Sequence, residues 1–304
     1  MRLASVRGGG AGGEWRLGVV GDDLGVALPD PELGTVDDIV RGGEDALARV
    51  ASALDGAPRV SLDEVELGPP LRRFNRDVLC TGWNYWDHYE ELRGKRGGQD
   101  PAERPTRPTF FTKGPAAVVG PRGPIAIDPD LSERFDYEAE LALVIGRTGR
   151  SIPESDALGH VFGYCVANDV SVRDLQRAHG GQWLKGKSID ATMPLGPWIT
   201  TADAVADLGG LRITCEVGGE IVQDARLGQM AFPVARLIAE LSWGMTLEAG
   251  DLLLTGTPSG VGNAREPQRF LAPGDRVVTR IEGLGELDNR VERVDLAAPA
   301  VGPA

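Results

Sequence analysis

The chain has 304 residues, a formal net charge of −13 and a hydrophobic content of 41%. This length allows one large domain and a small additional one. The negative charge argues against a nucleic-acid partner, because binding to phosphates requires a basic surface. No stretch approaches the roughly 18 consecutive apolar residues of a membrane span.

The residue composition also bears on location and fold class. Cys80, Cys165 and Cys215 are isolated, which suits a reducing compartment better than a disulfide framework. The N-terminus lacks the continuous apolar segment of a secretory signal. We therefore expect a cytoplasmic protein. The 42 glycines and 21 prolines indicate many turns and a β-rich fold.

Residues 1–70 are expected to form a small N-terminal, β-containing domain. Residues 15–20 and 24–28 have the pattern of a hairpin. Residues 36–54 have an apolar side typical of a helix. The segment Leu67-Gly-Pro-Pro-Leu71 is a plausible linker, and it separates this unit from a larger domain over residues 71–304.

A candidate proton-transfer pair follows. His88 lies in a predicted helical turn, and residues three apart in a helix share a face, so Glu91 is its expected partner. A carboxylate on one imidazole nitrogen fixes the tautomer and raises the basicity of the other nitrogen. Glu90 is the alternative partner. His160 precedes a core strand, and His179 has no acidic neighbour at helical spacing, so His88 is the favoured general base.

The segment from Arg93 to Pro108 is charged and rich in glycine and proline, which predicts a loop. Because it follows His88 and Glu91 directly, one hypothesis is a lid that closes over bound substrate. The alternative is an exposed surface insertion without function.

The most informative stretch is residues 134–146, which predicts a strand. Side chains alternate along a strand, so Glu138 and Glu140 project from one face. Their Cα atoms are expected about 6.6 Å apart, at about 3.3 Å per residue. Two carboxylates this close favour a hard divalent cation with oxygen ligands. The same spacing is equally typical of the polar edge of a solvated strand.

A third carboxylate follows a second apolar strand. Residues 161–167 form that predicted strand and deliver Asp169 to its end. Ser171 and Asp174 then have the spacing of a capping box that opens a short helix. Arg173 and Gln176 are expected to share one face of this helix.

Three further elements are predicted nearer the C-terminus. Residues 212–223 have the pattern of a hairpin with Gly218-Gly219 as its turn. Pro233 is expected in the first turn of a helix with an apolar stripe. Residues 251–254 are expected to form a strand.

Five motifs together resemble the fumarylacetoacetate hydrolase superfamily. They occur in the family's order and span about residues 75–295. They are Gly82-Trp-Asn-Tyr-Trp-Asp-His-Tyr-Glu-Glu91, Asp136-Tyr-Glu-Ala-Glu-Leu141, Asn168-Asp-Val-Ser-Val-Arg-Asp-Leu-Gln176, Lys185-Gly-Lys-Ser188 and Thr255-Gly-Thr-Pro-Ser-Gly-Val-Gly262.

The resemblance implies a fold and a metal site. The fold would be α+β and mainly β, a curved roll of mixed sheets with the site at one end. Glu138, Glu140 and Asp169 would hold one Mg²⁺ or Mn²⁺, with no Cys or His ligand that would favour zinc. Lys187 matches the family's lysine and would balance the negative charge.

It also implies a substrate and a reaction. The small-molecule substrate would be a 2-oxo acid, its polar end held by Arg173 and Gln176, with Thr257 as a further contact. The expected reaction is hydrolysis of a carbon–carbon bond in an acylpyruvate such as fumarylpyruvate, with His88, Glu91 and Lys187 as catalytic residues. The alternatives are a decarboxylase, a hydratase, an isomerase of 2-oxo-dienoates or a sugar-acid hydrolase on the same scaffold. The family also implies a homodimer.

Overall fold

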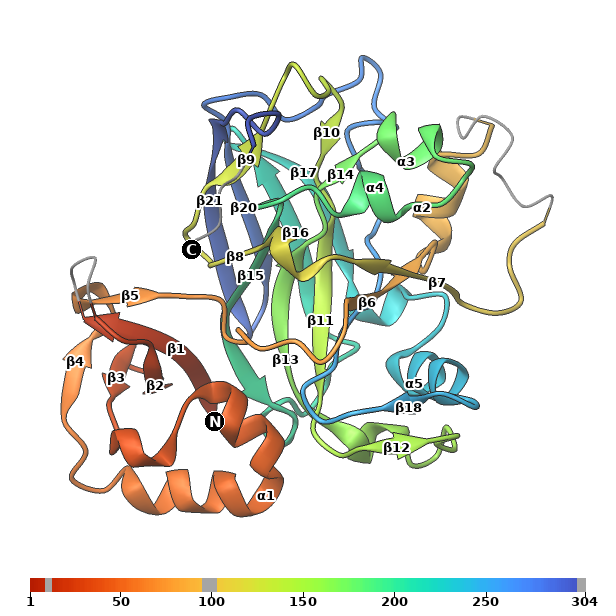
Figure 1. Ribbon diagram of the computed structural model, residues 1–304. Helices are drawn as coiled ribbons and strands as arrows, with labels where there is room; N and C mark the ends of the chain where they lie inside the picture. The colour runs from red at the N-terminus through yellow and green to blue at the C-terminus, as the bar shows by residue number, and fades with distance from the viewer. Residues whose placement is uncertain (9–12, 95–102, 300–304) are drawn as a thin grey trace.

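The computed structural model describes residues 1–8, 13–94 and 103–299 of the chain (Figure 1). Its largest sheet has twelve strands. Their bounds are β1 (Arg2–Gly8), β2 (Arg16–Val20), β3 (Gly25–Ala27), β4 (Arg59–Ser61), β5 (Val65–Leu67), β6 (Val78–Gly82), β7 (Thr109–Lys113), β8 (Val118–Val119), β11 (Ala139–Ile145), β13 (Val161–Asn168), β15 (Met193–Thr201) and β19 (Leu252–Leu254). Hydrogen-bonded neighbours follow the order β4-β3-β2-β1-β15-β13-β11-β19-β6-β7, with β5 on β1 and β8 on β15.

A second sheet has five strands in the order β17-β16-β20-β21-β9. Their bounds are β9 (Ile125–Ile127), β16 (Arg212–Val217), β17 (Glu220–Arg226), β20 (Arg276–Ile281) and β21 (Gly285–Arg293). Two short pairs complete the strands: β10 (Phe135–Asp136) with β14 (Ser171–Val172), and β12 (Gly149–Arg150) with β18 (Thr246–Leu247). The predicted hairpin over residues 212–223 is confirmed, with Gly218 and Gly219 both at positive φ in its turn.

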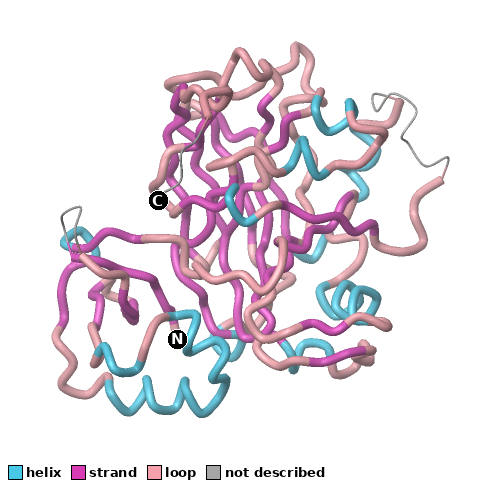
Figure 2. Tube along the Cα trace, in the orientation of Figure 1, coloured by secondary structure: helices cyan, strands magenta, loops and turns pink. Residues whose placement is uncertain are grey.

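The helices are short apart from α1, and most of the chain in Figure 2 is strand or loop. They are α1 (Val36–Ala53), α2 (Trp86–Glu91), α3 (Leu175–Ala178), α4 (Leu184–Lys187) and α5 (Val234–Ser242). Single 3₁₀ turns occur at Pro31–Leu33, Leu62–Glu64, Pro115–Ala117, Ala157–His160, Ala202–Ala204 and Leu227–Gln229. The prediction of an α+β, mainly β fold is confirmed. No helix in the described ranges is long and apolar enough to cross a membrane.

Strand β11 is buried on both faces, which explains its continuous apolar sequence. Leu141 and Leu143 pack into one apolar cluster together with side chains of the second sheet. Ala142 and Val144 face the other way, into a cluster that includes side chains of α1. Burying a leucine in this way contributes about 1.5–3 kcal/mol. The strand that carries Glu140 is therefore packed between two apolar clusters.

The N-terminal unit contains the predicted hairpin, as β2 and β3, and the predicted helix, as α1. Gly43, at φ 61°, places a kink inside α1. The sequence analysis missed β1, which pairs with β2 and also with β15 of the main sheet. Figure 1 shows this unit, red to orange, beside the main body. The division into residues 1–70 and 71–304 stays a prediction.

Two local predictions were wrong. Ser171 does not cap a helix: it lies in β14, and its Oγ donates to the carbonyl of Asp169 at 2.8 Å. Helix α3 begins later, at Leu175, with Asp174 as its N-cap. Pro233 is the N-cap of α5, one position before the helix. The pairing of Ser171 with Asp136, distant in sequence, sets the first of these boundaries. Residues 95–102 of the predicted lid lie outside the described residues.

Candidate metal centre and active site

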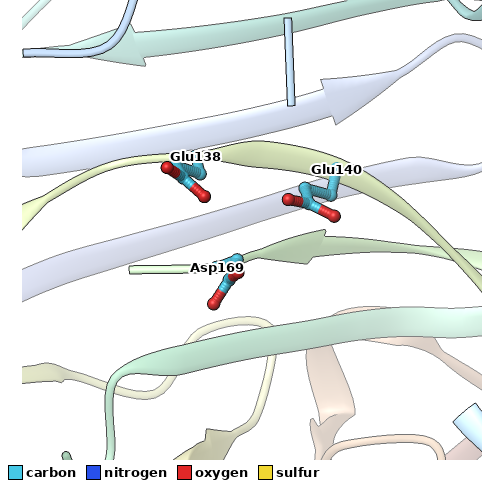
Figure 3. Close-up of side chains that lie close together, drawn as sticks. All are labelled: Glu138, Glu140 and Asp169. Atoms are coloured by element: carbon cyan, nitrogen blue, oxygen red, sulfur yellow. The ribbon is translucent and has the colours of Figure 1, made fainter. Parts of the chain in front are cut away.

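Three buried carboxylates meet where β11 and β13 run side by side. Ala139 pairs with Asn168, so the residues next to them in each strand lie close together. The N–H of Asp169 donates to the carbonyl of Glu138 at 2.8 Å, which fixes that register. One oxygen from each of Glu138, Glu140 and Asp169 lies within 4.8 Å of the others. Figure 3 shows the three side chains grouped, with Glu138 and Glu140 on one segment and Asp169 on the neighbouring one.

Two buried lysines lie against these carboxylates. Lys187 Nζ is 2.7 Å from Glu138 Oε2 and 2.6 Å from Asp169 Oδ2. Lys113 Nζ is 2.8 Å from Asp169 Oδ1 and donates to the carbonyl of Val170. Lys187 was predicted from the family resemblance. Lys113, the last residue of β7, was not predicted.

Arg173 is the third cation. Its Nε donates to Asp136 Oδ2 at 2.7 Å, and its Nη1 donates to Gln176 Oε1 at 3.3 Å. Its Nη2 forms an ion pair with Glu138 Oε1 at 2.7 Å. The expected proximity of Arg173 and Gln176 is therefore observed, but Arg173 lies before α3 and not on a helical face.

The charges of this cluster do not balance. Burial alone would raise the pKa of Glu138, but the charges of Lys187 and Arg173 outweigh it and hold the pKa at about 2. Burial and the charges of Asp169 and Glu138 raise the pKa of Glu140 well above its usual value. Four carboxylates face three cations in this part of the structure: Asp136, Glu138, Glu140 and Asp169 against Lys113, Arg173 and Lys187.

A divalent cation fits this donor set. It would supply the missing positive charge next to Glu140. The three carboxylates offer only oxygen ligands, which suit Mg²⁺ or Mn²⁺ and not zinc. All three are buried, so the alternative of a solvated strand edge is wrong for this pair of glutamates.

The predicted histidine–carboxylate pair is present on α2. His88 Nδ1 is 2.7 Å from Glu91 Oε1, and the other oxygen of Glu91 accepts from the N–H of Gly260 at 2.7 Å. Glu90 instead forms an ion pair with Arg104. Of the two carboxylates considered for His88, Glu91 is therefore the one in contact.

A loop over residues 255–263 holds the acidic side chains from the other side. Backbone N–H groups of Gly256, Gly262 and Asn263 donate to Glu140 and Asp136, at 2.7, 2.7 and 3.0 Å. Sequence reasoning did not find this role, because it belongs to the backbone and not to any side chain.

Thr257, in the same loop, has its hydroxyl group largely committed. Thr257 Oγ1 donates to the carbonyl of Ala139 at 2.9 Å and accepts from Gln223 Nε2 at 2.8 Å. One acceptor site remains on this oxygen. If Thr257 contacts substrate as predicted, its hydroxyl group can therefore only accept a hydrogen bond from it.

One cavity connects most of these groups. Its lining includes seven of the nine residues predicted from the sequence: His88, Glu138, Glu140, Arg173, Gln176, Lys187 and Thr257. Asp169 and Glu91 lie behind this surface, in contact with Lys187 and His88. Aromatic rings of Trp83 and Phe111 also line the cavity. Carboxylates for a metal, cations for an anion and a proton-transfer pair thus face the same space.

Residues 77–292 match the family description "Fumarylacetoacetate (FAA) hydrolase C-terminal". The chain belongs to the fumarylacetoacetate hydrolase family. The family predicted from the five motifs is thus confirmed, and it is a family of enzymes. The match begins just before β6 and ends within β21, so it covers the seven strands of the main sheet from β6 onward and nearly all of the second sheet.

Relatives within the fumarylacetoacetate hydrolase family carry several activities in their names. The chain is 40% identical over 276 residues to rat "Oxaloacetate tautomerase Fahd2a, mitochondrial", covering 90% of this chain and 85% of that protein. It is 39% identical over 236 residues to "Oxaloacetate tautomerase YisK" of Bacillus subtilis, covering 78% of this chain and 76% of that protein. The predicted cytoplasmic location stays a prediction.

Solved structures of family members superpose over nearly the whole chain. Fumarylacetoacetate hydrolase from Exiguobacterium antarcticum has a TM-score of 0.81 at 38% identity, covering 97% of this chain and 100% of that chain. Maleylpyruvate hydrolase from Sphingobium sp. SYK-6, solved with manganese(II) and pyruvate, has a TM-score of 0.79 at 30% identity, with the same coverage.

Proposed function

We propose that this protein is a divalent-metal-dependent oxaloacetate tautomerase, using Mg²⁺ or Mn²⁺. The observation that carries the proposal is the cavity onto which Glu138, Glu140 and the His88–Glu91 pair converge. Support for the substrate comes from the relatives named as oxaloacetate tautomerases, at 39–40% identity. Support for the metal comes from the acidic cluster and from the manganese in the related maleylpyruvate hydrolase.

Metal binding and anion binding would be divided between neighbouring side chains. A divalent cation held by Glu138, Glu140 and Asp169 would act as a Lewis acid on the oxygens of a 2-oxo acid. Arg173, which lines the cavity, would donate to a substrate carboxylate. Lys187 keeps two of the carboxylates neutralised and so lowers the repulsion that an anionic substrate meets.

His88 would move the proton. Tautomerisation of oxaloacetate moves one proton between C3 and the oxygen on C2, so one group that both accepts and donates a proton suffices. Glu91 contacts Nδ1 of His88, and Nε2 would be the nitrogen that exchanges the proton with substrate, because His88 lines the cavity. Gly260 holds the far oxygen of Glu91 and therefore limits rotation of the pair.

The test is the rate at which the enol form of oxaloacetate converts to the keto form, followed by the loss of enol absorbance with Mg²⁺ present. Free metal ions also promote this conversion, so the control is the Glu140→Ala protein at the same metal concentration. We expect acceleration by the wild-type protein above this control. Equal rates for the two proteins would overturn the proposal.

A second candidate is hydrolysis of an acylpyruvate, the activity first expected from the sequence. It is favoured by the His88–Glu91 pair, which is also suited to activate water, and by the likeness to maleylpyruvate hydrolase. The two candidates give different products. Incubation with acylpyruvates such as fumarylpyruvate releases pyruvate only if the carbon–carbon bond is hydrolysed. The same incubation with oxaloacetate detects a decarboxylase by its release of carbon dioxide.

A further inference from the structure

Trp183, the residue before α4, packs inside an aromatic cluster at the cavity. Its ring centroid lies 5.1 Å from that of Trp83 and 5.1 Å from that of Phe111, in edge-on contacts with interplanar angles of 76° and 63°. Such edge-on aromatic contacts are favourable beyond the area they bury. Trp183 is thus fixed between two rings that belong to the cavity wall.

Gly82, at the end of β6, makes room for this ring. A Cβ atom at Gly82 would lie 2.5 Å from Trp183 Cζ3 and 2.9 Å from Trp183 Cη2, closer than real side chains come. The indole therefore lies directly over the bare Cα of Gly82. A residue larger than glycine at position 82 would therefore displace the Trp183 ring from its present position.

Helix α4 connects Trp183 to Lys187. The N–H of Lys187 donates to the carbonyl of Trp183 at 3.1 Å, so the two residues are one helical turn apart. Lys187 Nζ also lies 4.9 Å from the ring centroid of Phe111, within the range of a cation–π contact. The ammonium group is thus held between that ring and the carboxylates of Glu138 and Asp169.

We propose that Trp183 is a positioning residue that holds the Lys187 ammonium group between Glu138 and Asp169. The absence of a side chain at Gly82 allows the Trp183 ring to take this position. The inference rests on the proposed metal site, but not on which 2-oxo acid is the substrate. It assigns Trp183 a role in anion binding and not in holding the metal. When Trp183 is lost, Lys187 leaves the two carboxylates, and the site becomes more negative.

The direction of the effects distinguishes this role from general damage. A more negative site binds a divalent cation at least as well as before, but it repels an anionic ligand. Collapse of the local fold would instead weaken both. Two probes suffice: Mn²⁺ alone, and oxalate in the presence of saturating Mn²⁺. Both are measured by isothermal titration calorimetry, and neither depends on turnover.

The variants are Trp183→Ala, Lys187→Gln and the double variant. Leu184→Ala is the matched control, because Leu184 is in the same helix but 49% exposed. We expect Trp183→Ala to weaken oxalate binding by about tenfold, the scale of one charge-assisted contact, without weakening Mn²⁺ binding. Adding it to Lys187→Gln should cause no further loss, and Leu184→Ala should match the wild type. Gly82→Ala should reproduce the effect and carries the test if Trp183→Ala fails to fold.

Three other results would count against the proposed roles of Trp183 or Lys187. A loss of oxalate affinity that is as large in the Lys187→Gln background as in the wild type would overturn the inference, because Trp183 would then act independently of Lys187. A parallel loss of Mn²⁺ affinity would overturn it too. If Lys187→Gln itself leaves oxalate binding unchanged, the proposed role of Lys187 in the metal site fails, and that failure is separate from the one tested with Trp183.

Discussion

Replacing Glu91 by glutamine tests the proton-transfer pair most directly. Glutamine preserves the shape, and its amide oxygen can still accept from the N–H of Gly260, as Glu91 does at 2.7 Å. Its NH₂ group then faces His88 Nδ1, where a carboxylate oxygen now lies at 2.7 Å. Because an amide NH₂ only donates, Nδ1 must become the acceptor and the ring proton must move to Nε2. His88 then cannot accept a proton from substrate.

The expected loss is large and confined to catalysis. Removing a positioned general base, or forcing the wrong tautomer on it, costs roughly 10²- to 10⁴-fold in kcat, or about 3–5 kcal/mol of barrier. The hydrogen bond from Gly260 is kept, so the free energy of unfolding should change by less than about 1 kcal/mol. Mn²⁺ affinity should be unchanged, because Glu91 contacts His88 and Gly260, neither of which is one of the three proposed metal ligands.

The assay is kcat for enol–keto conversion of oxaloacetate, with urea unfolding and Mn²⁺ titration on the same protein. The matched control is Glu90→Gln, on the same helix, which loses exposed ion pairs with Arg104 and Arg93. A Glu91→Gln enzyme as active as Glu90→Gln would refute the reasoning. Damage from Glu90→Gln alone would show that the contact partner of His88 changes in solution.

Further predictions concern the metal, the core, the assembly and pH. Glu140→Ala should abolish Mn²⁺ binding in calorimetry together with activity, and full activity in excess chelator would contradict this. Lys113→Met should destabilise the fold by about 3–5 kcal/mol in urea unfolding, because it leaves a buried carboxylate without one of its partners. Light scattering should give the mass of a homodimer, and a strict monomer over a wide concentration range would contradict it. Partial burial would raise the pKa of Asp38, but hydrogen bonds from Thr35 and the ion pair with Arg73 hold it at about 2, below its usual 3.8. This stabilisation is therefore full above pH 3.8 and lost as pH falls through about 2. With the carboxylate 44% exposed, screening reduces it to about 1 kcal/mol. Asp38→Asn should lose that amount in urea unfolding at pH 7 and almost none near pH 2, and an equal loss at both pH values would contradict it.

Local sequence patterns predicted the elements whose cause is local. One strand was predicted over residues 134–146, and the structure has β11 over its apolar part and the short β10 before it. The three-residue spacing of His88 and Glu91 gave the right contact. The glycine pair at 218–219 gave the right hairpin. In each case the residues that decide the structure are neighbours in the chain, or the spacing itself defines the geometry.

Other parts of the site depend on contacts distant in sequence. Lys113 lies 56 residues before Asp169, and nothing around it in the sequence separates it from a surface lysine. Arg173 was predicted to be on a helix, but pairing of Ser171 with Asp136 extends the chain there and delays the helix to Leu175. A local capping pattern lost to a strand pairing formed by the tertiary fold.

The loop over residues 255–263 shows why the metal site and the proton-transfer pair belong to one unit. Its backbone donates to Glu140 from Gly256 and to Glu91 from Gly260, so two side chains with separate proposed roles share one rigid support. Both glycines have positive φ, 93° and 109°, where a side chain would be strained. A Cβ at Gly260 would also lie 2.0 Å from the carbonyl oxygen of Val222. Because the donors are backbone groups at fixed spacing, a shift of this loop moves the metal ligand and the partner of His88 together. The geometry that connects the two proposed roles therefore depends on glycine at positions 256 and 260.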